Sequence, residues 1–191
     1  DIYDLASITK IASSALILMQ LESENRFSVD STLGSYLPEI LDSTEYKNLV
    51  LKEILTHQAG LASWIPFYIK TLNDGMPSYE LYSKLPSNIH QSLVAKNLYM
   101  LSSYRDTIFE RILSTDINKN KKYKYSDVGY YFINEIIKKI TFNSQDLIAE
   151  SIYNKIGLQN IGYNPLRKWD LSRITPTEND TFFTHQLIHG Y

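Results

Sequence analysis

The chain has 191 residues, of which 43% are hydrophobic and 21% charged, so it is long and apolar enough to bury the core of a globular domain. Nineteen basic against 21 acidic residues leave a formal net charge of −2, and no basic stripe breaks this balance, which argues against nucleic-acid binding. The absence of cysteine excludes disulfide scaffolds, thiolate zinc sites and cysteine nucleophiles. The chain begins at Asp1 without a signal-peptide pattern, so we interpret it as a piece of a longer protein.

The spacing of apolar residues predicts a mostly helical chain that forms a single domain over residues 1–191. Residues 7–22 are apolar on nearly every side, which is typical of a helix buried in the middle of a domain. The longest apolar stretch, residues 5–21, is interrupted by Lys10 and is also too short for a membrane span. Further helices are expected at residues 30–38, 51–57, 105–113, 128–140 and 144–157.

The segment 64–122 is less regular, because its tyrosines are scattered among serines, asparagines and prolines. We expect a helical insertion or lid there. Few stretches favour strands, and the two candidates are residues 122–126 and 160–163. The chain is therefore expected to contain little sheet.

Ser7 and Lys10 stand three residues apart at the start of the first predicted helix, so both side chains lie on one face. A neutral lysine there can take the serine proton while the serine oxygen attacks a carbonyl. Lys10 is the only charged residue between Asp4 and Glu22, so it either faces a cleft or has a lowered pKa, and both suit a catalytic base. The alternative is a lysine that extends from the first turn into water. The spacing alone favours neither alternative.

Tyr125, Ser126 and Asp127 form the second candidate motif. A tyrosine beside a lysine can act as a general base or a proton relay, because the positive charge lowers the pKa of its hydroxyl. Asp127 directly precedes a predicted helix, so the alternative is a plain N-cap, which is the commoner role for such a residue. This motif on its own favours the N-cap.

Taken together, the two motifs resemble those of the serine β-lactamase and penicillin-binding protein superfamily. The narrower resemblance is to its class C-type branch, which includes class C β-lactamases, D-alanyl-D-alanine carboxypeptidases and related esterases. Residues 4–10 match the first motif of that branch and residues 125–130 the second, while residues 29–39 and 55–61 are similar to a short helix and a recurrent loop. The resemblance implies an α+β fold of the β-lactamase/transpeptidase type. This chain would be its mostly α-helical part, without the flanking sheet strands.

The resemblance also implies a role for each residue. Ser7 would be the acylated nucleophile, Lys10 its activating base and Tyr125 the proton relay to the leaving group. The backbone N–H of Ser7 would supply one donor of the oxyanion hole. Asp127 stands where the branch usually has an asparagine, and its negative charge weakens the expectation of efficient β-lactam hydrolysis. The third motif of the superfamily, K-T-G or H-x-G, is absent, since His189–Gly190 lacks the intervening residue, so we expect this piece to be inactive by itself.

These features predict a serine hydrolase that acts on an amide or ester, such as a β-lactam, a D-Ala peptide or an ester, through an acyl-serine intermediate. The resemblance implies an extracytoplasmic location in a bacterium, in the periplasm or at the cell surface. A small molecule or a peptidoglycan peptide would be the substrate. Residues 174–180 and 186–191 are similar to modules joined to family-3 glycoside hydrolases, which implies that a fusion to such a domain is possible.

The four histidines form no metal-ligand pattern, and neither a metal nor another cofactor is expected. The sequence does not predict an oligomeric state. Two alternatives to an enzyme remain. One is a catalytically inactive homologue that binds cell wall or a partner protein. The other is a structural helical domain with a chance S-x-x-K, in which Lys10 would be exposed and far from Tyr125.

Overall fold

The computed structural model describes residues 1–191, which divide into two compact units. We call them the helical unit and the β unit. The helical unit consists of Ala6–Ile65 and Ile112–Tyr163, and the β unit of Asp1–Leu5, Pro66–Arg111 and Asn164–Tyr191. The expectation of one domain over residues 1–191 stays a prediction. No helix reaches the length and hydropathy that a membrane span requires.

The helical unit begins with a helical segment whose turns change in type. A 3₁₀ turn, η1 (Ala6–Ile8), is followed by a π-helix, η2 (Lys10–Ala15), and then by α1 (Leu16–Ser23). The rest of the unit consists of α2 (Leu33–Tyr36), α3 (Pro38–Leu41), η3 (Glu45–Asn48), α4 (Leu51–Leu55), α6 (Val128–Thr141) and α7 (Gln145–Lys155).

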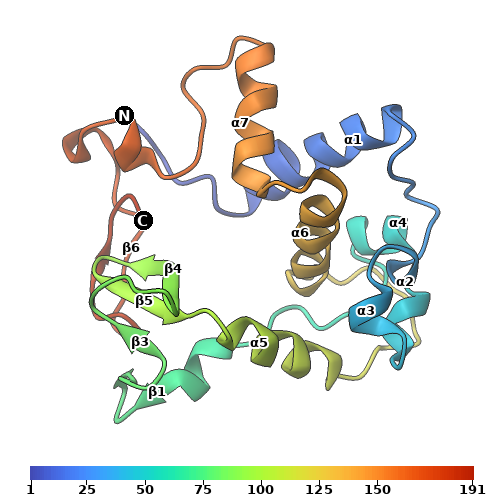
Figure 1. Ribbon diagram of the computed structural model, residues 1–191, viewed down its shortest axis with the longest axis horizontal. Coiled ribbons are helices and arrows are strands. Elements are labelled where there is room, and N and C mark those ends of the chain that lie inside the picture. Colours follow the sequence, from blue (N-terminus) through green and yellow to red (C-terminus); the bar gives the residue numbers. More distant parts are fainter. The chain divides into compact units, whose positions relative to one another are not determined.

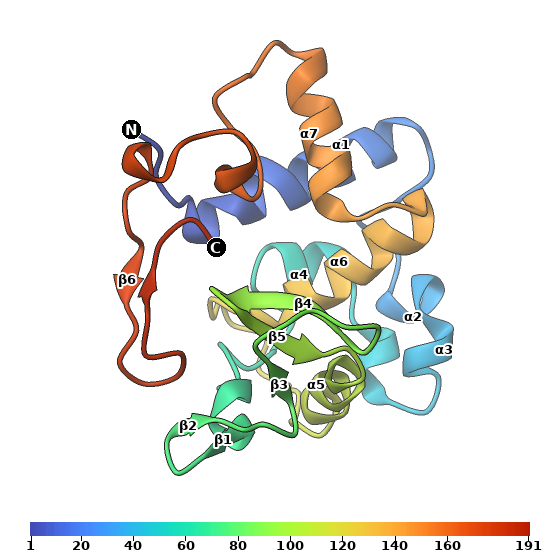
Figure 2. The same ribbon diagram turned by 60° about the vertical axis from the view of Figure 1, so that its left-hand side comes forward.

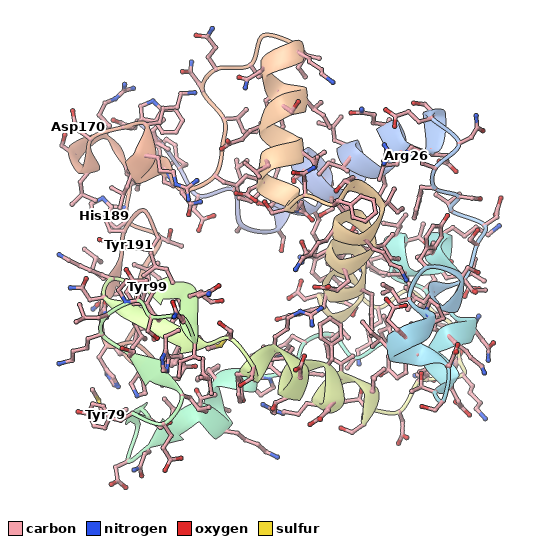
Figure 3. All side chains as sticks on the ribbon, in the orientation of Figure 1. Arg26, Tyr79, Tyr99, Asp170, His189 and Tyr191 are labelled. Carbon is pink, nitrogen blue, oxygen red and sulfur yellow. The ribbon has the colours of Figure 1, made fainter.

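Helix α6 carries the centre of the core in the helical unit. Its apolar residues recur at helical spacing, so one face is fully buried, and Phe132, Ile133, Ile136 and Ile137 are each 0% exposed. The helix lies between α7 and α4 and also packs against η2 (Figure 1). The packing on η2 brings the first turn of α6 beside Lys10. At its other end, the Ile140 carbonyl accepts a hydrogen bond from Arg26, a residue that Figure 3 labels.

The first helical segment is only partly buried. Ile17, Leu18 and Leu21 lie in the core, whereas Ile11 is 73% exposed and Met19 67%. The prediction of a helix buried on every side is therefore wrong for this face. An apolar pattern shows that a helix face is suited to burial, but it does not show which element packs against that face.

The β unit holds three small antiparallel sheets. Their strand orders are β1-β2, β3-β5-β4 and β6-β7, and Figure 2 shows the three-stranded sheet. The elements of this unit are η4 (Phe67–Thr71), β1 (Leu72–Asn73), β2 (Met76–Pro77), β3 (Tyr82–Ser83), β4 (His90–Ala95), β5 (Leu98–Leu101), η5 (Pro165–Arg167), η6 (Leu171–Arg173), β6 (Glu178–Asn179) and β7 (Leu187–Ile188). Helix α5 (Tyr104–Leu113) follows β5.

The content of segment 64–122 differs from the expectation. It contains β1 to β5 and one α-helix, α5, instead of being mainly helical. Strands β4 and β5 pair across a two-residue turn in which Asn97 takes φ +51°, a conformation that asparagine tolerates. That this segment acts as an insertion or lid stays a prediction. The strands expected at 122–126 and 160–163 are wrong, because both stretches have irregular backbone.

Candidate active site

Ser7 and Lys10 form a hydrogen-bonded pair in the helical unit. Ser7 lies in η1 and Lys10 is the first residue of η2, and Lys10 Nζ donates a hydrogen bond to Ser7 Oγ over 2.9 Å. Ala6, directly before Ser7, has φ +43°, a left-handed conformation that strains an alanine. Strained backbone of this kind persists where the surrounding structure enforces it, and it is frequent at functional sites.

The π-helical turn after Ser7 is held by a partly buried polar network. The Tyr163 hydroxyl donates to Ser13 Oγ over 2.7 Å, and Gln145 Nε2 donates to the same oxygen over 3.1 Å. The Tyr153 hydroxyl donates to the Ala12 carbonyl over 2.7 Å. A π-turn shifts the backbone hydrogen bonds of a helix, so outside donors of this kind help to satisfy its carbonyls. The network thereby fixes the turn that carries Lys10.

Asp127 pairs with Lys10. It occupies the N-cap position of α6 but makes no side-chain capping bond, and its Oδ1 lies 2.6 Å from Lys10 Nζ. The Lys10 side chain is only 15% exposed, whereas that of Asp127 is 48% exposed. At this distance the two groups form a close ion pair. Neither a plain N-cap at Asp127 nor a lysine extending into water fits this geometry.

Tyr125 completes the group. Its hydroxyl is close enough to Ser7 and Lys10 for both to lower its pKa, and Lys10 Nζ lies 5.1 Å from the centroid of its ring. The same ammonium is 5.4 Å from the Tyr130 ring, so two aromatic faces stabilise the cation. Tyr125 remains 41% exposed, which leaves the group open to a substrate. The structure thus brings Ser7, Lys10, Tyr125 and Asp127 together, while their catalytic roles stay predictions.

The charges in this group favour a protonated lysine and an acidic tyrosine. Partial burial lowers the pKa of Lys10, but hydrogen bonds and charge from Asp127 and Tyr125 outweigh it, so the pKa is raised overall. The hydrogen bonds from Ser7 and then Lys10 lower the pKa of the Tyr125 hydroxyl. Of the two alternatives for Lys10, a position in a cleft or a lowered pKa, the lowered pKa does not fit, because the carboxylate of Asp127 lies beside the lysine.

His57 is a member of this site that sequence analysis did not identify. Its ring centroid lies 4.4 Å from that of Tyr125, and its Nδ1 accepts a hydrogen bond from the Ser126 N–H over 3.1 Å. The sequence held one signal, since residues 55–61 resemble a recurrent loop of the class C-type branch. That signal marks a loop, however, and does not show which side chain the loop directs toward the tyrosine.

The tail histidines make their hydrogen bonds within the β unit. His189 Nε2 is hydrogen-bonded to the Ile174 carbonyl within the β unit, and Figure 3 marks its place near the C-terminus. His185 Nε2 is hydrogen-bonded to the Gly75 carbonyl in the same unit. No cluster of three histidine, aspartate or glutamate side chains is placed to hold a metal ion.

The fold and the sequence together place the chain in the serine β-lactamase and penicillin-binding protein superfamily. The chain belongs to the Beta-lactamase family, whose model matches residues 1–177. The expected superfamily and fold class are therefore confirmed.

Three similar proteins illustrate the relationship. A protein of Escherichia coli (strain K12), provisionally named D-alanyl-D-alanine carboxypeptidase, is 29% identical over 98% of this chain and 40% of its own length. The N-acetylmuramyl-L-alanine amidase of Bacillus subtilis (strain 168) is 28% identical over 87% of this chain and 34% of its own length. The penicillin binding protein from Bacillus halodurans shares the fold, with a TM-score of 0.56 and 13% identity over 94% of this chain and 51% of that one. The chain thus spans less than half the length of the two curated relatives.

Proposed function

We propose that the whole protein is a serine hydrolase that cleaves an amide or ester bond through an acyl-serine intermediate on Ser7. The observation that carries this proposal is the 2.9 Å hydrogen bond between Lys10 Nζ and Ser7 Oγ, with the Tyr125 ring centroid 5.1 Å from the same Nζ. The Ser7 hydroxyl therefore has a proton acceptor within reach, the phenolate of Tyr125, and the positive charge of Lys10 beside it.

Tyr125 is the proton acceptor in this proposal, and Lys10 is a fixed cation. As the Ser7 Oγ–carbonyl bond forms, the Oγ proton passes to the Tyr125 phenolate, which then protonates the leaving nitrogen or oxygen. In the second half, Tyr125 accepts a proton from water while the water oxygen attacks the acyl-serine, and Ser7 Oγ takes that proton back. This assignment departs from the role expected from the resemblance, in which Lys10 is the base. The raised pKa of Lys10 supports the change, because a protonated lysine cannot accept a proton.

The names of the relatives favour an amide of a peptidoglycan peptide as substrate, since one is a muramyl-alanine amidase and another carries a carboxypeptidase name. A protein with such a substrate acts outside the cytoplasm of a bacterium. We expect residues 1–191 alone to lack turnover, because the third motif of the superfamily is absent from them. A fusion to a family-3 glycoside hydrolase stays part of the proposal.

The second candidate function is binding without catalysis. Its support is Asp127, which stands where asparagine is usual and lies 2.6 Å from Lys10 Nζ. The negative charge of a carboxylate so close to Ser7, Lys10 and Tyr125 is tolerable in a protein that only binds cell wall or a partner protein.

The deciding experiment treats the whole protein with a serine-reactive phosphonate and records its intact mass. We expect one adduct on the native protein and none on Ser7→Ala. Ser23→Ala is the matched control, because Ser23 is an exposed serine in the same helical segment, and it should be labelled like the native protein. A folded native protein without an adduct would support the binding function.

A further inference from the structure

Two loops of the helical unit lie along each other and place Tyr125. The Lys124 N–H donates to the His57 carbonyl over 2.9 Å, and the Asp127 N–H donates to the Ser63 carbonyl over 2.7 Å. Between them, Ser126 Oγ donates to the Ala62 carbonyl over 2.6 Å. The residues on both sides of Tyr125 are therefore fixed to loop 57–63, which is itself outside the Ser7–Lys10 helix.

His57 contacts this segment in three ways. Its carbonyl accepts from Lys124, its Nδ1 accepts from the Ser126 N–H over 3.1 Å, and its ring lies against that of Tyr125 at 4.4 Å and an interplanar angle of 38°. Its backbone has φ +58°, the left-handed conformation that points carbonyl and ring toward the same neighbouring segment. A non-glycine residue in this conformation is uncommon, so the surrounding contacts hold it there.

We propose that His57 is a positioning residue that holds Tyr125 beside Ser7 and Lys10 only while its Nδ1 is unprotonated. An amide N–H is a donor, so its partner on the ring must offer a lone pair, and neutral His57 then carries its proton on Nε2. A second proton turns Nδ1 into a donor that faces the Ser126 N–H, and the bond is lost. This proposal deepens the proposed function. The expected effect on Ser7 rests on Ser7 being the nucleophile, whereas the positioning of Tyr125 by His57 does not.

The surroundings of His57 keep it neutral at neutral pH. Partial burial and the nearby Lys10 charge lower its pKa, and the charge of Asp127 opposes them without outweighing them. The ionisable side chains that face it are Lys10 from η2, Tyr123, Tyr125 and Asp127 from the segment before α6, and Tyr130 from α6. Acidification below about pH 6.5, the ordinary pKa of a histidine, therefore begins to release the Tyr125 segment.

Two substitutions separate the acceptor from the ring. His57→Asn places an amide oxygen near the position of Nδ1, does not titrate, and suits the left-handed backbone. His57→Phe keeps an aromatic ring for Tyr125 and has no acceptor. Thermal unfolding at neutral pH shows whether each variant folds, and a His57→Phe that does not fold leaves the comparison of native protein with His57→Asn.

The measurements are made on the whole protein across acid and neutral pH. One follows the ¹⁵N-labelled Ser126 amide and the His57 ring nitrogens by NMR, and the other follows the rate of phosphonate labelling at Ser7. In the native protein we expect the Ser126 amide signal to shift as His57 titrates. We expect the labelling rate to fall at least about tenfold over the same pH range, a lower limit that is smaller than the full contribution of a general base. Both should be independent of this titration in His57→Asn, and His57→Phe should label slowly at every pH.

Two outcomes would overturn the proposal. One is a Ser126 amide that ignores the His57 titration, and the other is a His57→Asn protein whose acid profile equals that of the native protein. If the amide responds but the native protein is never labelled, the positioning role stands and the hydrolase proposal fails. The two proposals are therefore tested separately.

Discussion

The carboxylate of Asp127 lies at the N-terminus of α6, but it interacts with Lys10 in η2 and does not cap α6. Ser126 Oγ accepts the Val128 N–H at 3.2 Å, so a free donor of the first turn is satisfied by the neighbouring residue. This leaves Asp127 Oδ1 to approach Lys10 Nζ at 2.6 Å. The charge of Asp127 therefore acts on the protonation of Lys10 and Tyr125 more than on the end of the helix.

Asp127→Asn should move the pH profile of Ser7 labelling to lower pH. The carboxylate raises the pKa of Tyr125, so its removal lets the phenolate form at a lower pH, and the pKa of Lys10 falls because its counter-charge is gone. The measurement is the labelling rate of the whole protein from neutral to alkaline pH. Asp30→Asn is the matched control, because Asp30 is also paired with a lysine, Lys52, at 2.6 Å but is largely exposed. An unchanged profile in Asp127→Asn would show that this carboxylate does not tune the site.

At the scale of elements, the long helices could be predicted and the small sheets could not. Helices α6 and α7 confirm the predictions at 128–140 and 144–157, because each buries a face whose apolar residues recur at helical spacing. Most strands of the β unit have two residues, too few for an alternating pattern, and they form by pairing with partners elsewhere in the chain. The π-helical form of η2 also has no signature in the sequence.

The site was predictable as a set of residues but not as a set of charges. Spacing and resemblance pointed to Ser7, Lys10 and the Tyr125 segment, and the structure brings them together. The raised pKa of Lys10 depends on Asp127, and the place of His57 depends on a loop contact with Ser126. Such effects arise between segments far apart in the chain, so no local pattern contains them.

Gly129 makes a testable contact between α4 and α6. A Cβ at this position would lie 2.4 Å from Cγ2 of the buried Ile54, so Gly129→Ala forces the two helices to shift. Overpacking costs about 1–3 kcal/mol, against a helix-propensity gain of about 1 kcal/mol for alanine over glycine, so we expect net destabilisation. Denaturant unfolding checks it. In the Ile54→Ala background the cost of Gly129→Ala should shrink, and purely additive costs would contradict the clash.

At the scale of the whole molecule, each unit contains a titratable side chain whose stabilising contacts are lost in acid, and the two side chains lose them in different pH ranges. His57 in the helical unit has a lowered pKa, so its contribution to stability is full above about pH 6.5 and is lost as the pH falls. Asp180 in the β unit accepts hydrogen bonds from the N–H groups of Phe182, Phe183 and Thr184. Burial raises the pKa of Asp180, but these bonds outweigh it and lower the pKa, so its contribution persists down to below about pH 3.9.

Acidification should therefore loosen the two units in sequence. We expect the amides of residues 124–127 to lose protection below about pH 6.5, while those of residues 182–184 keep theirs until below about pH 3.9. Hydrogen exchange read by mass spectrometry, corrected for the intrinsic effect of pH on exchange, distinguishes the two segments. His57→Asn should delay the first loss and leave the second unchanged. Simultaneous loss in both segments would contradict separate acid limits.

The π-turn at Lys10–Ala15 also governs how the chain tolerates changes in length. Successive residues of an α-helix are rotated by about 100° around its axis, so deleting one residue within this turn would restore α-helical spacing and rotate everything before it. Ile17 and Leu21 would keep their places in the core. Ser7 and Lys10 would turn away from Tyr125. The direction of the Ser7 and Lys10 side chains thus depends on the number of residues in this turn. A chain shortened by one residue there would fold with the same core while Ser7 faces away from Tyr125.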